Sequence, residues 1–269
     1  MTISDIVHKH MLRGFARPVA QNLAAEEIFL TKLAKSDMVD NATLKGGIVM
    51  YNLSKNERRA TRDIDFDFIR YSIDEDSVLL FIRRLNRQDD GFSIAARGPI
   101  TKLHQQDYEG VRVNVTITDR ADGFLRLKLD IGVHKHLEIK QTKLLFMMET
   151  GEKVSLLVNS PEQVFAEKCL SLGRLGPIST RYKDVYDLYY LVSVGIDPKM
   201  VHSILCTFIK NAKRPPYDLR RLKNNVFKAF DDPKFSLEAQ SVKNRWLDVD
   251  YQEIVESLKS FLGKCTAEE

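Results

Sequence analysis

Hydrophobic and polar residues alternate strictly over residues 63–68, which read DIDFDF. Because neighbouring side chains of a strand point to opposite faces, this pattern predicts a strand with one apolar and one acidic face. The acidic face would carry Asp63, Asp65 and Asp67, spaced about 6–7 Å apart. Carboxylates this close repel one another unless a cation neutralises them, and hard oxygen ligands suit Mg²⁺. The pattern predicts a metal platform, with a solvated acidic edge strand as the alternative.

The rest of the chain divides by periodicity and by helix-capping signals. Helices are predicted over residues 3–13, 18–36, 48–55, 74–87, 197–211, 217–230 and 250–262, and two more begin at Ser160 and just after Arg181. Strands are predicted over residues 92–96, 111–118 and 125–133, followed by two or three short extended segments over 140–158. The first three strands are separated by polar turns, so we expect an antiparallel meander.

The pattern changes from strand-like to helical near residue 159. Ser160, Pro161 and Gln163 occupy the N-cap, N1 and N3 positions of a capping box. We therefore predict an α/β (α+β) fold, in which residues 1–159 form a mixed sheet with flanking helices and residues 160–269 form a helical domain.

Composition adds few constraints. The chain of 269 residues has a net charge of +4, 43% hydrophobic and 29% charged residues, and three scattered cysteines. These are globular values, and the charge permits a nucleic-acid partner without requiring one. The N-terminus resembles no secretory signal, and no run of about 18 apolar residues indicates a membrane span. Together with the unpaired cysteines, this predicts a cytoplasmic protein without a membrane partner.

A glycine pair, Gly46-Gly47, lies before the predicted helix at 48–55. Glycine lets the backbone approach a ligand closely, and backbone amides at a helix start bind phosphate. Lys45 and Arg59 are nearby cations. This segment and the acidic strand predict a phosphate cradle beside a metal platform.

Three further candidates lie later in the chain. Asp130 shares the polar face of the 125–133 strand with Lys128 and would join the platform if that strand neighbours residues 63–68. Asp184 lies on one helical face with Asp187. Lys168 is placed at a helix edge, from which its ammonium could reach a phosphate. The alternatives are an isolated strand-end aspartate and ordinary solvated ion pairs.

Two groups of motifs together resemble the AbiEii/AbiGii toxin family of nucleotidyltransferases over residues of about 44–191. The first is Lys45-Gly46-Gly47 followed by Arg59-x-Thr61-x-Asp63-Ile64-Asp65. The second is Glu167-Lys168 followed by Arg181-x-Lys183-Asp184-x-x-Asp187-Leu188. This sequence departs from the family pattern at Ile48, where the family often has Thr or Ser. Phosphate binding would therefore rest on backbone amides and on cations.

The resemblance implies a nucleotidyltransferase fold with the nucleotide held between the two domains and Lys168 reaching its phosphates. It implies an Mg²⁺ ion on Asp63 and Asp65, and either Asp130 or Asp184 orienting the attacking hydroxyl. The implied catalytic residues are Asp63, Asp65, Asp130, Lys168 and Asp184. The implied nucleotide-binding residues are Lys45, Gly46, Gly47, Arg59 and Lys168.

The resemblance also implies a biological role. Related proteins are toxins of type IV toxin–antitoxin systems, some of them in phage defence, and their antitoxin is encoded separately. The implied reaction moves NMP from an NTP to an acceptor, such as a tRNA 3′ end, and releases pyrophosphate. Two alternatives stay open: modification of protein hydroxyls, and a non-catalytic nucleotide-binding module.

Overall fold

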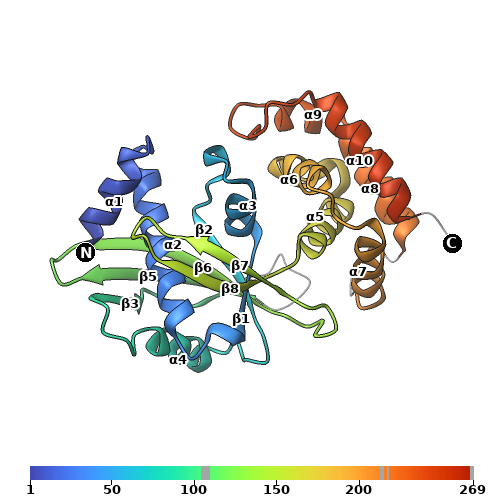
Figure 1. The fold of residues 1–269 in the computed structure, drawn as a ribbon. Helices are drawn as coiled ribbons and strands as arrows, with labels where there is room; N and C mark the ends of the chain where they lie inside the picture. The colour runs from blue at the N-terminus through green and yellow to red at the C-terminus, as the bar shows by residue number, and fades with distance from the viewer. Residues whose placement is uncertain (104–109, 213–214, 217, 267–269) are drawn as a thin grey trace. The chain divides into compact units, whose positions relative to one another are not determined.

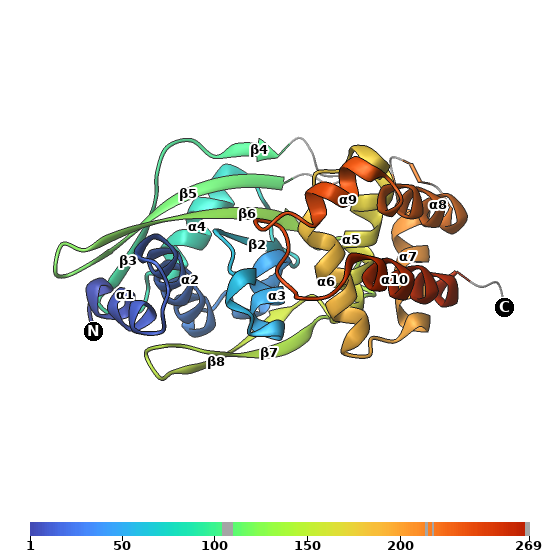
Figure 2. The same cartoon turned by 90° about the horizontal axis from the view of Figure 1, so that it is seen from above.

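The computed structural model describes residues 1–103, 110–212, 215–216 and 218–266. The chain divides into two compact units, Met1–Asn159 and Ser160–Glu269. Figures 1 and 2 show the elements of both units. Within the described parts of the chain, no helix has both the length and the apolar character needed to cross a membrane.

The first unit is built on a mixed sheet with the strand order β3-β5-β6-β2-β1-β8-β7, and β4 pairs with β5. The strands are β1 Ala42–Lys45, β2 Asp63–Phe68, β3 Phe92–Ala96, β4 Thr101–Leu103, β5 Gly110–Asp119, β6 Phe124–Val133, β7 Thr142–Met147 and β8 Lys153–Val158. The helices of this unit are α1 Ile3–Leu12, α2 Arg17–Lys35, α3 Gly46–Ser54 and α4 Glu75–Leu85. The predicted α/β class is therefore confirmed.

The pairing of the strands places β2 at the centre of the sheet. β3, β5 and β6 form the predicted antiparallel meander, and β6 then pairs with β2 in parallel. On its other side β2 forms an antiparallel pair with β1. β1 was not predicted from the sequence, because four residues are too few to establish the period of a strand.

The apolar face of β2 forms part of the core. Ile64, Phe66 and Phe68 are fully buried. The ring of Phe66 lies 5.8 Å from that of Phe29 on α2 and 5.6 Å from that of Phe81 on α4, measured between centroids. Helices α2 and α4 therefore cover this face, and burial of large aromatic side chains contributes strongly to stability. The aspartates are left on the opposite face of the strand.

The second unit is helical over its described residues. Its helices are α5 Pro161–Leu175, α6 Tyr182–Ser193, α7 Pro198–Lys210, α8 Leu219–Phe230, α9 Pro233–Ala239 and α10 Tyr251–Cys265. The side chain of Ser160 caps α5 by accepting a hydrogen bond from the backbone N–H of Gln163 at 3.1 Å, as predicted. The short helix α9 was not predicted, because its seven residues show too little periodicity.

Candidate active site

The acidic face of β2 lies beside the polar face of β6, and β5 follows on the far side of β6. The parallel register sets Asp63 opposite Lys128 and Asp65 opposite Asp130. Asp63 and Lys128 form an ion pair, with about a third of each side chain exposed. β6 is therefore the neighbour that the sequence analysis required for Asp130 to lie beside the other carboxylates.

Asp130 is held by an arginine on the next strand. Arg112 of β5 donates from Nε to Asp130 Oδ1 at 2.8 Å and from Nη2 to Oδ2 at 2.7 Å. Such a bidentate pair fixes the plane of the carboxylate. The hydrogen bond to Asp130 raises the pKa of Arg112, and the charges of Asp130, Asp63 and Asp65 add to the effect against the cost of burial. The negative charges of three carboxylates therefore stabilise the charged guanidinium of Arg112.

Asp67 is the third aspartate of the face, and its surroundings differ from those of the other two. It is 4% exposed, and its Oδ1 lies 2.6 Å from Nζ of Lys45, which is 7% exposed. The ammonium of Lys45, which was expected near a phosphate, is thus bound by a neighbouring carboxylate. Its role toward nucleotide stays a prediction.

The glycine pair lies directly against the acidic strand. Gly46 has a φ of +65°, and a Cβ atom there would lie 2.4 Å from Oδ2 of Asp65. A Cβ at Gly47 would lie 2.8 Å from the Cβ of Thr61 and 3.2 Å from Nη1 of Arg59. Only residues without side chains let the start of α3 come this close to these groups.

The first turn of α3 therefore begins beside Asp65. The amides of this turn have no acceptor within the helix, and the helix dipole adds a partial positive charge. Arg59 is 7% exposed, and its guanidinium lies close to Gly47. Ile48 is 1% exposed, so it belongs to the core. Backbone amides, rather than a hydroxyl at position 48, are the donors that this turn offers to an anion.

The carboxylates of this face fit a magnesium ion. Mg²⁺ typically takes one or two protein carboxylates and completes its shell with water and phosphate oxygens. Asp63 and Asp65 have the required chemistry, and the lack of a side chain at Gly46 lets the first turn of α3 approach Asp65 closely. Within the described residues, no group of three or more His, Cys, Asp or Glu side chains is arranged to hold a metal ion without such help.

The other candidate residues form a buried cluster in the second unit. Nζ of Lys168 on α5 lies 2.6 Å from Oδ1 of Asp184 and 2.7 Å from Oδ2 of Asp187, both on α6. Asp187 also accepts a hydrogen bond from Nε1 of Trp246 at 3.0 Å. All four residues are at most 9% exposed.

This burial corrects the expected edge position of Lys168. The ion pairs with Asp184 and Asp187 are in the interior of the unit, because α6 covers the side of α5 that carries Lys168. One oxygen of this cluster remains less satisfied: Oδ2 of Asp184 is buried with no hydrogen-bond partner among the described residues. It faces Nη1 of Arg181 at 3.8 Å.

Sequence analysis missed two residues that contact the predicted ones. Arg112 could have been found from the alternation of β5, which puts Arg112 on a polar face with Asn114. The bond from Trp246 to Asp187 had no signal, because the loop before α10 shows no periodicity. Two basic residues that could contact a nucleic acid, Lys213 and Arg214, lie outside the described residues.

Comparisons with known proteins bear on both units. The family model described as "Nucleotidyl transferase AbiEii toxin, Type IV TA system" matches residues 28–264. No curated protein matches the chain. A crystal structure of an antigenic nucleotidyltransferase-like protein from Paracoccidioides brasiliensis is similar at 16% identity, with a TM-score of 0.41, over 76% of this chain and 92% of that one. That likeness is too distant to support an argument.

Proposed function

Because the chain belongs to the AbiEii family of nucleotidyl transferase toxins of type IV toxin–antitoxin systems, we propose that it transfers NMP from an NTP to a tRNA 3′ end with release of pyrophosphate. Nucleotidyl transfer and a separately encoded antitoxin follow from the family. The acceptor, the metal and the residue roles are our proposal.

One observation carries the proposal beyond the family match. The turn at Gly46 touches Asp65 so closely that a single methyl group would collide with the carboxylate. A helix start, whose amides suit an anion, and a carboxylate, which suits a cation, therefore lie side by side. A nucleoside triphosphate with Mg²⁺ has both charges in one ligand, so it suits this pair of features.

The residues of the first unit would act mainly by positioning and electrostatics. The amides at Gly46 and Gly47 would donate to phosphate oxygens, with Arg59 and Lys45 adding positive charge. Asp63 and Asp65 would hold Mg²⁺, which when bound supplies neutralisation of the phosphate charge. Arg112 would keep Asp130 in one orientation through its bidentate hydrogen bonds.

Asp130 and Asp184 are the two candidates for the base that accepts the proton of the attacking hydroxyl. Asp130 lies opposite Asp65 on the neighbouring strand, which favours it. Asp184 has a buried oxygen without a hydrogen-bond partner among the described residues, which would suit a hydroxyl donor. We propose Asp130 for the base. For Lys168 and Asp184 we propose a contribution to transfer that depends on their mutual ion pair.

The acceptor is tested by incubating the purified protein with each α-labelled NTP and Mg²⁺, together with either total RNA or cell protein. We expect the label to appear in RNA of tRNA size. A 3′ exonuclease should then remove the label, because the added nucleotide would be at the 3′ end. The Asp65→Asn variant serves as the inactive control. Label in protein alone would favour modification of protein hydroxyls, and no transfer to either would favour a nucleotide-binding module.

A further inference from the structure

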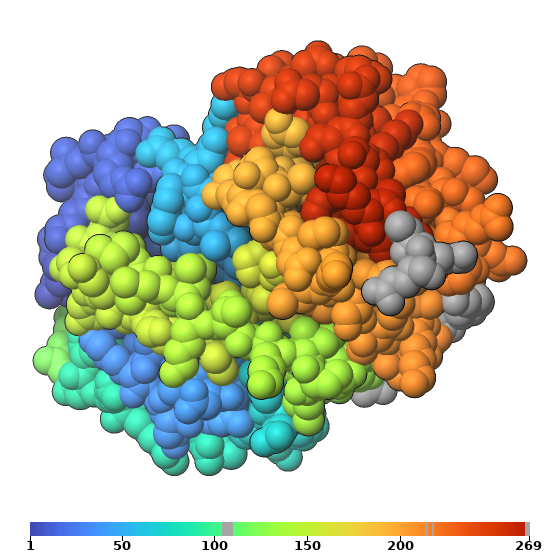
Figure 3. Space-filling view, turned by 45° about the vertical axis from the view of Figure 1, so that its right-hand side comes forward, coloured from blue at the N-terminus to red at the C-terminus, as the bar shows by residue number. Residues whose placement is uncertain are grey.

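A small cavity lies in the first unit, and its lining includes none of the residues assigned to transfer. Residues of α1, α3 and the β7–β8 hairpin contribute to its lining, and Figure 3 shows these segments side by side in dark blue, light blue and yellow-green. Its volume is about 50 Å³. Since a water molecule needs about 10–15 Å³ on this measure, the cavity has room for roughly four atoms of that size.

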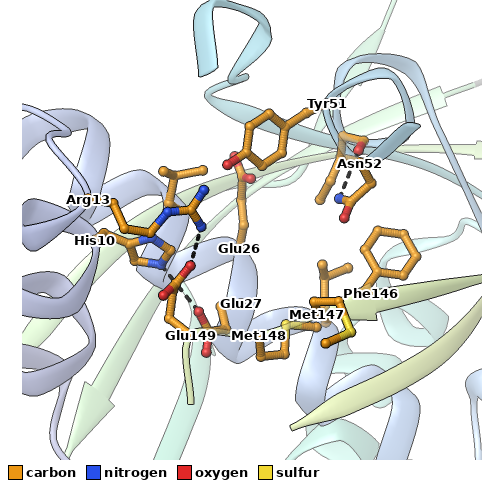
Figure 4. Close-up of a pocket in the computed structure, with 13 residues that line it drawn as sticks. His10, Arg13, Glu26, Glu27, Tyr51, Asn52, Phe146, Met147, Met148 and Glu149 are labelled. Carbon is orange, nitrogen blue, oxygen red and sulfur yellow. Dashed lines mark hydrogen bonds and ion pairs between the residues drawn. The ribbon is translucent and has the colours of Figure 1, made fainter. Parts of the chain in front are cut away.

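Three carboxylates line the cavity, and two of them have partners. Glu27 accepts from His10 Nε2 at 3.2 Å and from the backbone N–H of Thr150 at 2.9 Å. Glu149 forms an ion pair with Arg13 (Figure 4). Both of these carboxylates already have partners within the chain, so the third carboxylate determines what else the cavity attracts.

That third carboxylate belongs to Glu26, which is 4% exposed. Its Oε1 has no hydrogen-bond partner among the described residues, and neither has Nδ1 of buried His10. Burial raises the pKa of Glu26 well above its ordinary value, and the charge of Asp63 raises it further. A buried carboxyl group with an unpartnered oxygen and a raised pKa would be stabilised in its charged form by a bound cation.

Aromatic side chains accompany Glu26. Tyr51 and Phe146 line the cavity, and the Glu26 carboxyl points toward Tyr51 in Figure 4. Burial raises the pKa of Tyr51, and the nearby charge of Glu26 contributes to the increase while that of Arg13 opposes it. A carboxylate beside aromatic rings is a common environment for an organic cation.

We propose that this cavity binds a guanidinium group, which would donate hydrogen bonds to the carboxyl group of Glu26 beside the ring of Tyr51. The group has four heavy atoms, which matches the room available, and its fork of donors suits a carboxylate. A metal ion fits less well, since the described side chains offer no group of three or more metal-binding residues. The guanidinium could belong to a free small molecule or to an arginine of a partner protein.

The test is calorimetric titration of the full-length protein with millimolar guanidinium chloride, at constant ionic strength set with sodium chloride. We expect Glu26→Gln to weaken binding at least tenfold, because charge-assisted hydrogen bonds contribute that much. Glu152→Gln is the matched control, since Glu152 is an exposed carboxylate paired with Lys35 outside the cavity. It should leave the affinity unchanged.

Two further arms complete the test. Tyr51→Leu should weaken binding about threefold, which tests the cavity independently if Glu26→Gln fails to fold. If a capped Gly-Arg-Gly peptide binds more tightly than arginine amide, the ligand is an arginine of a protein partner. If arginine amide binds more tightly than the peptide, the ligand is a free small molecule. Equal affinity of Glu26→Gln and the wild type, or equal binding of a citrulline peptide, would overturn the proposal.

Discussion

At the scale of single residues, the three aspartates of β2 share a face but not an environment. Asp63 pairs with a partly exposed lysine, Lys128, so the pair contributes only about 0–1 kcal/mol to stability. Asp67 is buried against Lys45. Asp65 lies under Gly46. Equal charge and regular spacing therefore do not give these three carboxylates equal roles.

We predict that Asp63→Asn or Asp65→Asn abolishes transfer and leaves the thermal midpoint nearly unchanged. The physical reason is that Asn keeps the shape of the side chain but is a much weaker ligand for a hard cation than a carboxylate. Labelled-NTP transfer and thermal unfolding measure the two effects. Near-normal turnover by either variant would show that the metal assignment is wrong.

Asp67→Asn provides the matched comparison, and its effects should be the reverse. Transfer should fall less than in the Asp65 variant. Stability should fall by up to about 3–5 kcal/mol, because the ammonium of Lys45 stays buried after its partner has lost its charge. A loss of transfer as complete as that of Asp65→Asn, in a stable protein, would place Asp67 among the metal ligands.

Gly46 allows a second test at this scale. Gly46→Ala combines a positive φ with a collision against Asp65, whereas Gly151→Ala has a φ of +90° and a Cβ that meets no described atom within 4 Å. Both should lose about 1–2 kcal/mol through backbone strain. We expect only Gly46→Ala to lose transfer, and equal activity of the two variants would remove Gly46 from the site.

At the scale of elements, sequence reasoning succeeded where the signal is local. The period of two over residues 63–68 predicted β2 and its faces, and the capping residues at Ser160 predicted the start of α5. Pairing between strands is not local. The alternation of β6 showed which face Asp130 shares, but only the parallel register with β2 places it opposite Asp65.

The cluster around Lys168 shows the same limit for helices. The periodicity of α5 distinguishes its apolar from its polar positions but does not reveal which polar position another helix covers. Packing of α6 buries Lys168 against Asp184 and Asp187. An isolated surface pair and a buried triad give the same sequence pattern, so the burial could not have been predicted.

This burial changes what we expect of Lys168→Ala. The substitution leaves two buried carboxylates without their ammonium, so the variant should be destabilised by about 3–5 kcal/mol. Lys199→Ala, at an exposed lysine on α7, should change stability by no more than about 0.5 kcal/mol. Urea unfolding measures both variants.

Transfer by Lys168→Ala is then measured at a temperature where the variant is folded. We expect a loss of at least tenfold, since charge-assisted contacts of this kind contribute roughly 1.5–3 kcal/mol. Normal transfer by the folded variant would limit Lys168 to a structural role.

At the scale of the whole molecule, the chain has two compact units, and each has its own buried core. Trp246, the single tryptophan of the sequence, lies in the second unit at 1% exposure and is bonded to Asp187. Its fluorescence should therefore report the second unit alone, whereas the sheet of the first unit dominates the strand signal in circular dichroism.

This arrangement predicts that the two units unfold separately. Phe66→Ala empties a fully buried position in the first unit and should cost about 3–5 kcal/mol there. In urea, the circular dichroism of the sheet should then be lost earlier, while the tryptophan midpoint stays where it is in the wild type. Leu258→Ala, at a fully buried position of α10, should shift the tryptophan midpoint and spare the sheet. If either variant moved both signals together, the units would unfold as one cooperative structure.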